Sequence, residues 1–563
     1  MTDGPGARAG ADAAPRQLAA SAWALTTIAW RTAPAHLIAY GLTMAAAALA
    51  PVVAAWLTKL IIDGLAGTSA RSGTVTGLAG LAIALAGVGV ATAVLPHATG
   101  YLGGEIGRRL VLKATDRLFG AAARLPGLRP FEDPRFLDRL RLAQEGTTAG
   151  GTTVTEAFGT ARSVLTLIGF IGALLVISPV MTAIVLLTAV PALVIQLQLS
   201  RWRAGMLWQL SPVERWRFLY SDLLANVNAA KEIRLFGSGG FLRDRMMTQL
   251  RTATALRRRM DRRELATEGV LAMLGAVVAG GGLNWAIYAA LSGALSPGDV
   301  TMFVSAVAAM QAALAALVIS LAAAHHGLLM FGHYLAVLHT EPDLPVAVEP
   351  VPLRPLRDGI QFRDVWFRYS EDHPWVLRGL NLVIPAGWSV GLVGLNGAGK
   401  STLVKLLCRF YDPEHGAILW DGVDLRDVRP EDLRAHISGV FQDYMSYDMS
   451  AEDNIAIGNI GDYGNIERIR AAADLARMDG TLSALPRGYD TLLTRMFFGE
   501  DDTQDASTGV VLSGGQWQRI ALARAFFRAG RDLMILDEPS AGLDPHAEAD
   551  LHQQTRRYRW GRT

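Results

Sequence analysis

Six apolar stretches, each about as long as a helix that crosses a bilayer, fill the chain up to residue 324 and leave few folds open. Only helices and closed barrels satisfy every backbone group inside a membrane, and such a helix needs about 20 apolar residues. We place the stretches at 36–61, 77–99, 161–178, 180–199, 267–292 and 300–324. Only Ser178 and Pro179 separate the third from the fourth, which predicts a tight hairpin. One stretch could be a buried helix of a soluble protein, but six in series predict an all-α, six-helix transmembrane domain.

Positive charge orients these spans. The links between spans two and three and between spans four and five are rich in arginine, as at Arg108, Arg109 and the cluster 257–259. The other links nearly lack Lys and Arg, and positively charged loops stay on the cytoplasmic side. We therefore expect both basic links and both chain termini to face the cytoplasm, with the protein in the inner (cytoplasmic) membrane.

The basic links also have a helical pattern. About 25 residues from Gly103 onward, at 1.5 Å each, would project about 40 Å beyond the membrane. They could form a solvated helical surface or a rigid lever that reaches a cytoplasmic domain, and their length favours the lever.

Composition marks the domain boundaries. Half of the chain is apolar (51%) and only 18% is charged, which favours a membrane part joined to a soluble part. Residues 1–20 lack a long apolar core and predict a disordered tail without a signal peptide. Repeated prolines predict a linker at 341–358, between a membrane domain at 21–340 and a soluble domain at 359–563. The single cysteine, Cys408, excludes a disulfide within the chain, and the net charge of +2 gives no indication of a nucleic-acid partner.

The soluble part contains a phosphate-binding loop. Residues 394–402 fit G-x-x-x-x-G-K-[ST], between an apolar run at 388–393 that predicts a buried strand and a helical pattern at 403–407. Glycines let backbone N–H groups turn toward phosphates, Lys400 would reach the terminal phosphates, and the Ser401 hydroxyl would bind Mg²⁺. The candidate ATP-binding residues in this loop are Gly394, Asn396, Gly397, Gly399, Lys400, Ser401 and Thr402.

Two further motifs carry chemistry. An apolar strand before Asp537 and Glu538 delivers both carboxylates at its C-terminal end, where α/β sheets bind ligands. Asp537 suits Mg²⁺, and Glu538 could polarise the attacking water. Upstream, residues 512–516 read LSGGQ at the start of a helix, which predicts a second anion site. One nucleotide rarely needs two such sites, so we expect two copies to face each other, each closing over the partner's nucleotide.

Tyr369 ends an alternating strand pattern at 361–369. An aromatic side chain there could stack on a nucleotide base, and an edge-strand tyrosine explains the pattern equally well.

The order of the phosphate loop, Gln442, LSGGQ and LDEP (residues 536–539) resembles that of the ATP-binding cassette (ABC) transporters. The six spans resemble an exporter half-transporter. The resemblance implies a helical transmembrane domain followed by an α/β P-loop ATPase domain. It also implies that Tyr369 stacks on adenine, that Gln442 contacts Mg²⁺ and senses the membrane domain, and that Asp544 links two sites. Ser513, Gly514, Gly515 and Gln516 would close on the partner's ATP. Residues 131–134 and 231–236 resemble coupling helices.

Two departures from the family pattern matter. The family places a histidine well beyond the catalytic glutamate, whereas His546 and His552 come too early for that role. We therefore expect an ATPase domain that is incomplete at its C-terminus, with hydrolysis in doubt. The acidic run at 500–502 with Asp505 is expected to be a solvated insertion.

The sequence thus predicts ATP-driven export of an amphiphilic small molecule, lipid or peptide by alternating access of a homo- or heterodimer, with ATP and Mg²⁺ as cofactors. The alternative is a catalytically impaired or regulatory half of a heterodimer, or an inactive truncated product. The absent histidine supports the alternative, whereas Glu538 and LSGGQ support export.

Overall fold

A computed structural model describes residues 15–67, 72–494, 509–528, 530–539 and 563. The chain forms two compact units, which are described separately. The first comprises Met1–Ala122 with Asp138–Thr340, and the second comprises Ala123–Leu137 with Glu341–Thr563. The linker expected at 341–358 contains no helix or strand, and the second unit includes it.

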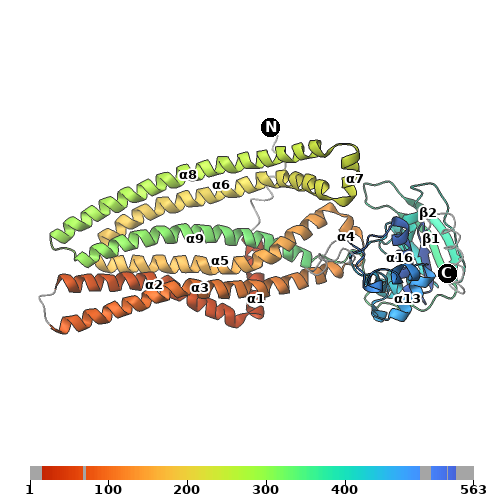
Figure 1. Cartoon of the computed structure of the whole chain (residues 1–563), viewed down its shortest axis with the longest axis horizontal. Helices are drawn as coiled ribbons and strands as arrows, with labels where there is room; N and C mark the ends of the chain where they lie inside the picture. The colour runs from red at the N-terminus through yellow and green to blue at the C-terminus, as the bar shows by residue number, and fades with distance from the viewer. Residues whose placement is uncertain (1–14, 68–71, 495–508, 529, 540–562) are drawn as a thin grey trace. The chain divides into compact units, whose positions relative to one another are not determined.

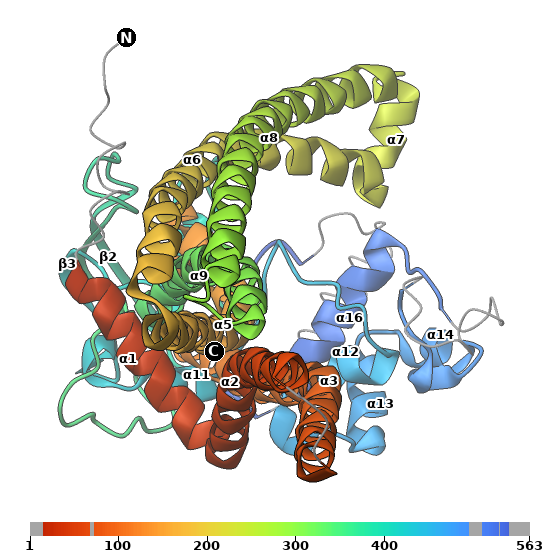
Figure 2. The ribbon, with the colours of Figure 1, turned by 90° about the vertical axis from the view of Figure 1, so that its left-hand side faces the viewer.

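The first unit is a bundle of long helices (Figure 1). In the described residues they are α1 (Pro15–Thr32), α2 (Pro34–Ala66), α3 (Ser72–Ala123), α5 (Pro134–Ile177), α6 (Pro179–Ala225), α7 (Val227–Leu235), α8 (Gly239–Leu291) and α9 (Pro297–Leu338). Helix α6 packs against α8, and α2 packs against α9 (Figures 1 and 2).

The helices α2, α3, α5, α8 and α9 are long and apolar enough to cross a membrane. They contain the first, second, third, fifth and sixth expected spans, and the fourth lies on α6. The expected hairpin is confirmed, because α5 ends at Ile177 and α6 begins at Pro179. Helix α8 has 53 residues. At 1.5 Å per residue it is about 80 Å long, far more than the roughly 30 Å of hydrocarbon it must cross. The spans therefore continue as helices beyond the membrane.

The predicted tail is partly wrong. Helix α1 begins at Pro15, so residues 15–20 are helical, and residues 1–14 lie outside the described part. The helix forms because Leu25 and Ala29 are buried in a core shared with Phe331 of α9. Packing of one apolar face supplies the stability that such a segment would lack alone.

Small residues let helices α3 and α5 approach closely outside their expected spans. A Cβ atom added to Gly151 of α5 would lie 2.8 Å from the Cα atom of Gly107 in α3, so the two backbones are in contact. Glycine allows this contact because it has no side chain to hold the backbones apart.

The second unit contains two small sheets. The antiparallel sheet has the order β2–β1–β3–β4, formed by β1 (Gly359–Phe367), β2 (Leu377–Pro385), β3 (His415–Trp420) and β4 (Val423–Asp424). The parallel sheet pairs β5 (Ile437–Val440) with β6 (Leu533–Leu536). The described α-helices are α4 (Arg129–Glu132), α10 (Lys400–Leu407), α11 (Pro430–Ala435), α12 (Ala451–Ala456), α13 (Ile466–Leu475), α14 (Asp479–Ser483) and α16 (Gly514–Phe527).

Two apolar cores organise these elements. One joins α10 to the antiparallel sheet and to both strands of the parallel pair. The other surrounds α16 and contains residues of α12 and α13, which lie near it in Figure 2. Each core meets the β5–β6 pair, so these two strands connect the phosphate-loop helix α10 with α16.

The buried strand expected at 388–393 is absent. These residues form neither helix nor strand, and Val393 is 99% exposed. The N–H of Met534 in β6 donates to the Thr563 carbonyl (2.9 Å), and the Gly387 N–H donates to the Thr563 hydroxyl (2.8 Å). Thr563 therefore lies between β6 and the start of this run. A strand needs backbone partners, and β6 directs these bonds to Thr563 instead.

Candidate functional site

The phosphate loop folds around its own lysine. Gly397 and Gly399 adopt left-handed conformations, with φ of 81° and 89°, and Gly399 precedes the first residue of α10. Glycine tolerates these angles because it has no Cβ. The Lys400 Nζ donates to the Gly394 carbonyl (2.7 Å) and to the Leu395 carbonyl (3.4 Å). The ammonium group and the N-terminus of α10 thus supply positive charge to the same loop.

The parallel strand pair brings Gln442 and Glu538 together. Val440 and Leu536 are paired at the ends of β5 and β6, and each site residue follows two positions later. The Gln442 Nε2 donates to Glu538 Oε2 at 2.9 Å. The Asp537 N–H donates to the Val440 carbonyl at 2.9 Å, which fixes the turn that holds both acids. The carboxylates therefore lie at the C-terminal edge of the strands, as the sequence predicted.

Gln518 is a site residue that the sequence reasoning missed. Its side chain is 3% exposed, and its Nε2 donates to the Pro539 carbonyl (2.7 Å) and the Glu538 carbonyl (3.4 Å). Glu538 has a left-handed backbone with φ of 50°, which costs a non-glycine residue about 1 kcal/mol or more. The amide of Gln518 helps to hold that conformation. A polar residue two positions after Gln516, facing the core, was the only signal in the sequence.

We expect Gln518→Leu to lower the free energy of unfolding by about 1–3 kcal/mol, because the partly buried carbonyl of Pro539 loses its donor. It should also lower kcat for ATP hydrolysis more than it changes KM, because the turn that carries Glu538 is less firmly held. Thermal unfolding and steady-state ATPase kinetics measure both effects. Gln518→Glu keeps the side chain's volume without the amide donor, so a harmless Gln518→Glu would contradict this role.

The LSGGQ motif forms the start of α16. The Ser513 hydroxyl accepts the Gln516 N–H, and the Gln516 side chain accepts the Ser513 N–H at 2.8 Å, a capping box. Ser513 and Gly514 are exposed. The Tyr444 hydroxyl donates to the Gly514 carbonyl at 3.0 Å, so this helix start is linked to the segment that carries Gln442. Among the described residues, no hydrogen bond joins residues 513–516 to the phosphate loop.

Tyr369 lies beside the phosphate-loop helix. β1 ends at Phe367, two residues before the end of the expected strand. The Tyr369 hydroxyl lies 3.0 Å from the Thr402 hydroxyl, and its ring meets Phe367 edge-on at 5.0 Å. Asp544, His546, His552 and the acidic run at 500–505 lie outside the described residues.

The two segments that resemble coupling helices form short helices. Residues 131 and 132 end α4, and residues 231–235 end α7. At the end of α7, Leu235 is 78% exposed and Phe236 is 71% exposed. An exposed apolar pair of this kind is typical of an interaction surface.

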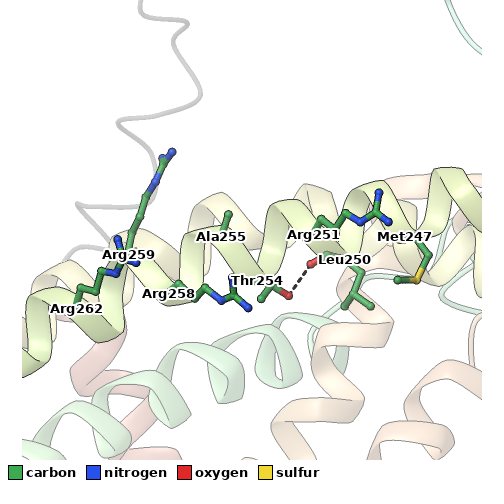
Figure 3. A pocket seen from close by; sticks show the side chains of 8 residues that line it. All are labelled: Met247, Leu250, Arg251, Thr254, Ala255, Arg258, Arg259 and Arg262. Atoms are coloured by element: carbon green, nitrogen blue, oxygen red, sulfur yellow. Dashed lines mark hydrogen bonds between the residues drawn. The ribbon is translucent and has the colours of Figure 1, made fainter.

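An arginine-rich hollow of about 430 Å³ lies along α8, outside the expected span at 267–292 (Figure 3). Its lining residues are Met247, Leu250, Arg251, Thr254, Ala255, Arg258, Arg259 and Arg262. Two other α8 arginines have partners in the described part of the chain. Arg257 bonds to Glu214, and Arg263 lies over the Trp202 ring. No ion pair joins the four lining arginines to a described carboxylate. We name this feature the arginine hollow.

Comparison with known proteins identifies the family. Residues 377–541 match the ABC transporter family, and residues 152–314 match the ABC transporter transmembrane region. The chain belongs to the ABC transporters. It combines the membrane and ATPase regions in one polypeptide and is thus a half-transporter of the exporter type.

Two relatives agree with this assignment, and a solved structure shares the fold. The chain is 27% identical to the subtilin transport ATP-binding protein SpaT of Bacillus subtilis over 75% of its own length and 67% of that protein. It is 34% identical to an ATP-dependent lipid A-core flippase of Alkalilimnicola ehrlichii over 60% of its length and 54% of the flippase. The match thus spans about half of that flippase. A bacterial Atm1-family ABC exporter with ATP bound shares the fold, with a TM-score of 0.79 and 22% identity over 95% of this chain and 90% of the other.

Proposed function

We propose that this chain exports a substrate across the cytoplasmic membrane as half of a dimer, using ATP binding and hydrolysis to alternate access. The observation that carries the proposal is the bond between Gln442 and Glu538, in a domain that also holds a phosphate loop and is fused to membrane-spanning helices. Both termini and the ATPase domain would be cytoplasmic, as the basic links indicate.

Each site residue has a role in this proposal. Lys400 and the N-terminus of α10 would bind the terminal phosphates, and the loop carbonyls of Gly394 and Leu395 would then lose their bonds to Lys400. Glu538 would orient the attacking water and accept its proton, while Gln442 holds that carboxylate in place. The proton acceptor is thus positioned before ATP arrives.

The donor set also fits Mg²⁺. The Ser401 hydroxyl, the Gln442 amide oxygen and the Asp537 carboxylate are oxygen ligands of the kind that Mg²⁺ accepts together with phosphate. When bound, Mg²⁺ would neutralise charge on the phosphate oxygens. Gln442 and Asp537 follow the paired strands β5 and β6, so both residues lie at the same edge of this sheet.

A second subunit would complete the site. Ser513 and Gly514 are exposed at the start of α16. Their described hydrogen bonds join them only to residues of this helix start and to Tyr444. An anion-binding helix start that faces solvent is available to a partner's nucleotide. The exposed Leu235, at the end of α7, and Phe236, which follows it, would likewise dock on the partner's ATPase domain.

Export is tested by ATP-driven cargo uptake into inverted vesicles containing the full-length chain. Wild-type chain should accumulate cargo over many turnovers, and Glu538→Gln should not. Equal movement by both would contradict ATP-driven export and leave a regulatory ATP-binding half as the remaining function.

We infer further that the cargo is an anionic amphiphile. Four arginines line the arginine hollow along α8, and Met247 and Leu250 line one end of it. Guanidinium groups bind phosphate and carboxylate through charge-assisted hydrogen bonds, and the apolar side chains suit a hydrocarbon part. The hollow lies on the cytoplasmic side of its span in the proposed orientation, where an exporter must take up its substrate.

We expect the double variant Arg258→Gln, Arg262→Gln to bind lysophosphatidic acid at least fivefold more weakly, a loss of about 1 kcal/mol. The loss is measured as weaker stimulation of ATPase activity by this lipid. Lysophosphatidylcholine, with a similar tail and no net charge, should stimulate little in either protein. Arg243→Gln is the matched control, because Arg243 is an exposed arginine of α8 outside the hollow. Equal loss in the control, or no loss in the double variant, would contradict the assignment.

A further inference from the structure

Residues 126–132, here called the coupling segment, are held to the ATPase domain by hydrogen bonds to their backbone atoms. The Leu128 N–H donates to the Phe410 carbonyl at 3.2 Å, just past the end of α10. Arg434 donates to the Pro126 carbonyl at 2.6 Å and to the Arg409 carbonyl at 2.7 Å. One guanidinium group thus joins the coupling segment to the chain that follows α10, so the segment and this helix form one local structure.

Glu132, the last residue of α4, makes the side-chain contact in this structure. Its Oε1 accepts a bond from Lys405 Nζ at 2.8 Å, and its Oε2 accepts the Tyr411 hydroxyl. Burial opposes the negative charge, but these two donors outweigh it and lower the pKa of Glu132. Burial likewise opposes the charge of Lys405, and the bond to Glu132 raises the pKa of Lys405 overall. Both groups are therefore ionised at neutral pH.

Lys405 connects this ion pair to the candidate base-stacking residue. Its ammonium group lies 5.2 Å from the centroid of the Tyr369 ring, a cation–π contact. The Tyr369 ring also meets the Tyr411 ring edge-on at 5.4 Å, and its hydroxyl bonds to Thr402. Thr402 and Lys405 lie three residues apart on α10 and therefore on one face of the helix. Both donors that hold Glu132 thus also contact Tyr369.

We propose that Glu132 is a positioning residue for the nucleotide base: by holding Lys405 and Tyr411, it fixes the ring of Tyr369 on which the base of ATP stacks. The inference rests on the nucleotide site of the proposed function and adds a contribution from the coupling segment to it. A phosphate-only ligand does not use Tyr369, so its affinity is independent of Glu132. By linkage, a bound base stabilises the attachment of the coupling segment as much as the segment strengthens base binding.

The test compares ATP with inorganic triphosphate, which carries the phosphates without a base. Binding of each, with Mg²⁺, is measured by calorimetry on the full-length chain in nanodiscs, with Glu538→Gln throughout to prevent turnover. We expect Glu132→Ala to weaken ATP binding by 3- to 10-fold and triphosphate binding by less than 2-fold. Base–aromatic stacking contributes enough free energy for a partial loss of this size. In a Tyr369→Ala background, Glu132→Ala should have no further effect on ATP binding.

An equal loss for ATP and triphosphate would mean that Glu132 only holds α10, and no loss for either would mean that it does not act on the site; both overturn the proposal. If the Glu538→Gln parent itself fails to bind ATP, the proposed nucleotide site fails instead. Asp138→Asn is the control, because Asp138 is an exposed acid of α5 close in sequence with no ion pair among the described contacts. Glu132→Asp should retain part of the ATP affinity.

Discussion

Glu538→Gln should lower the ATPase rate at least 100-fold while ATP still binds with near wild-type affinity. A positioned general base contributes about 10²- to 10⁴-fold to a reaction, and a glutamine amide cannot accept the proton of the attacking water. The substitution preserves the side chain's shape, so the contact with Gln442 at 2.9 Å can be retained through the remaining oxygen. Steady-state ATPase assays and equilibrium binding of ATP separate the two effects.

The matched control for this prediction is Glu467→Gln. Glu467 is an exposed residue in the first turn of α13, away from the strand ends that carry the candidate site. The Glu467→Gln variant should retain the wild-type rate of ATP turnover. Activity within threefold of wild type in Glu538→Gln would show that another group accepts the proton.

The second large effect concerns Lys400. Lys400→Ala should weaken ATP binding about 100-fold, or about 3 kcal/mol, because it removes the cation that would make charge-assisted hydrogen bonds to the terminal phosphates. The loop itself should keep its fold, since its left-handed turns at Gly397 and Gly399 are made by the backbone. Calorimetric titration with ATP and Mg²⁺ measures the loss.

Lys405→Ala is an informative comparison on the same helix. Lys405 contacts Glu132 and Tyr369 rather than the phosphate loop. Lys405→Ala should therefore weaken ATP binding far less than Lys400→Ala. Equal effects of the two substitutions would contradict a direct phosphate contact by Lys400.

Local patterns predicted the elements that depend on neighbouring residues. The two-residue break at Ser178 and Pro179 marked the hairpin, and the acids after 533–536 marked the end of β6. In each case a run of apolar residues is followed directly by the residues that end the element. A few neighbouring residues are therefore enough to predict it.

Other features depend on residues far apart in the chain, and the sequence alone did not predict them. Gln442 meets Glu538 only because β5 and β6 pair in parallel with a particular register. Glu132 bonds to Lys405, which lies 273 residues later in the sequence, and helix periodicity cannot predict that contact. Residues 388–393 were expected to form a strand from their apolar character, but a strand also requires backbone partners, which periodicity does not supply.

In the proposed dimer, each ATP site combines the phosphate loop of one subunit with the LSGGQ motif of the other. Chains carrying Lys400→Ala and chains carrying Ser513→Arg should each be inactive alone, because both of their sites are damaged. Co-expression with two different affinity tags yields mixed dimers, in which one site has an intact loop and an intact motif. We expect the purified mixed dimers to recover ATPase activity well above either parent, whereas activity no higher than that of the parents would contradict a shared site.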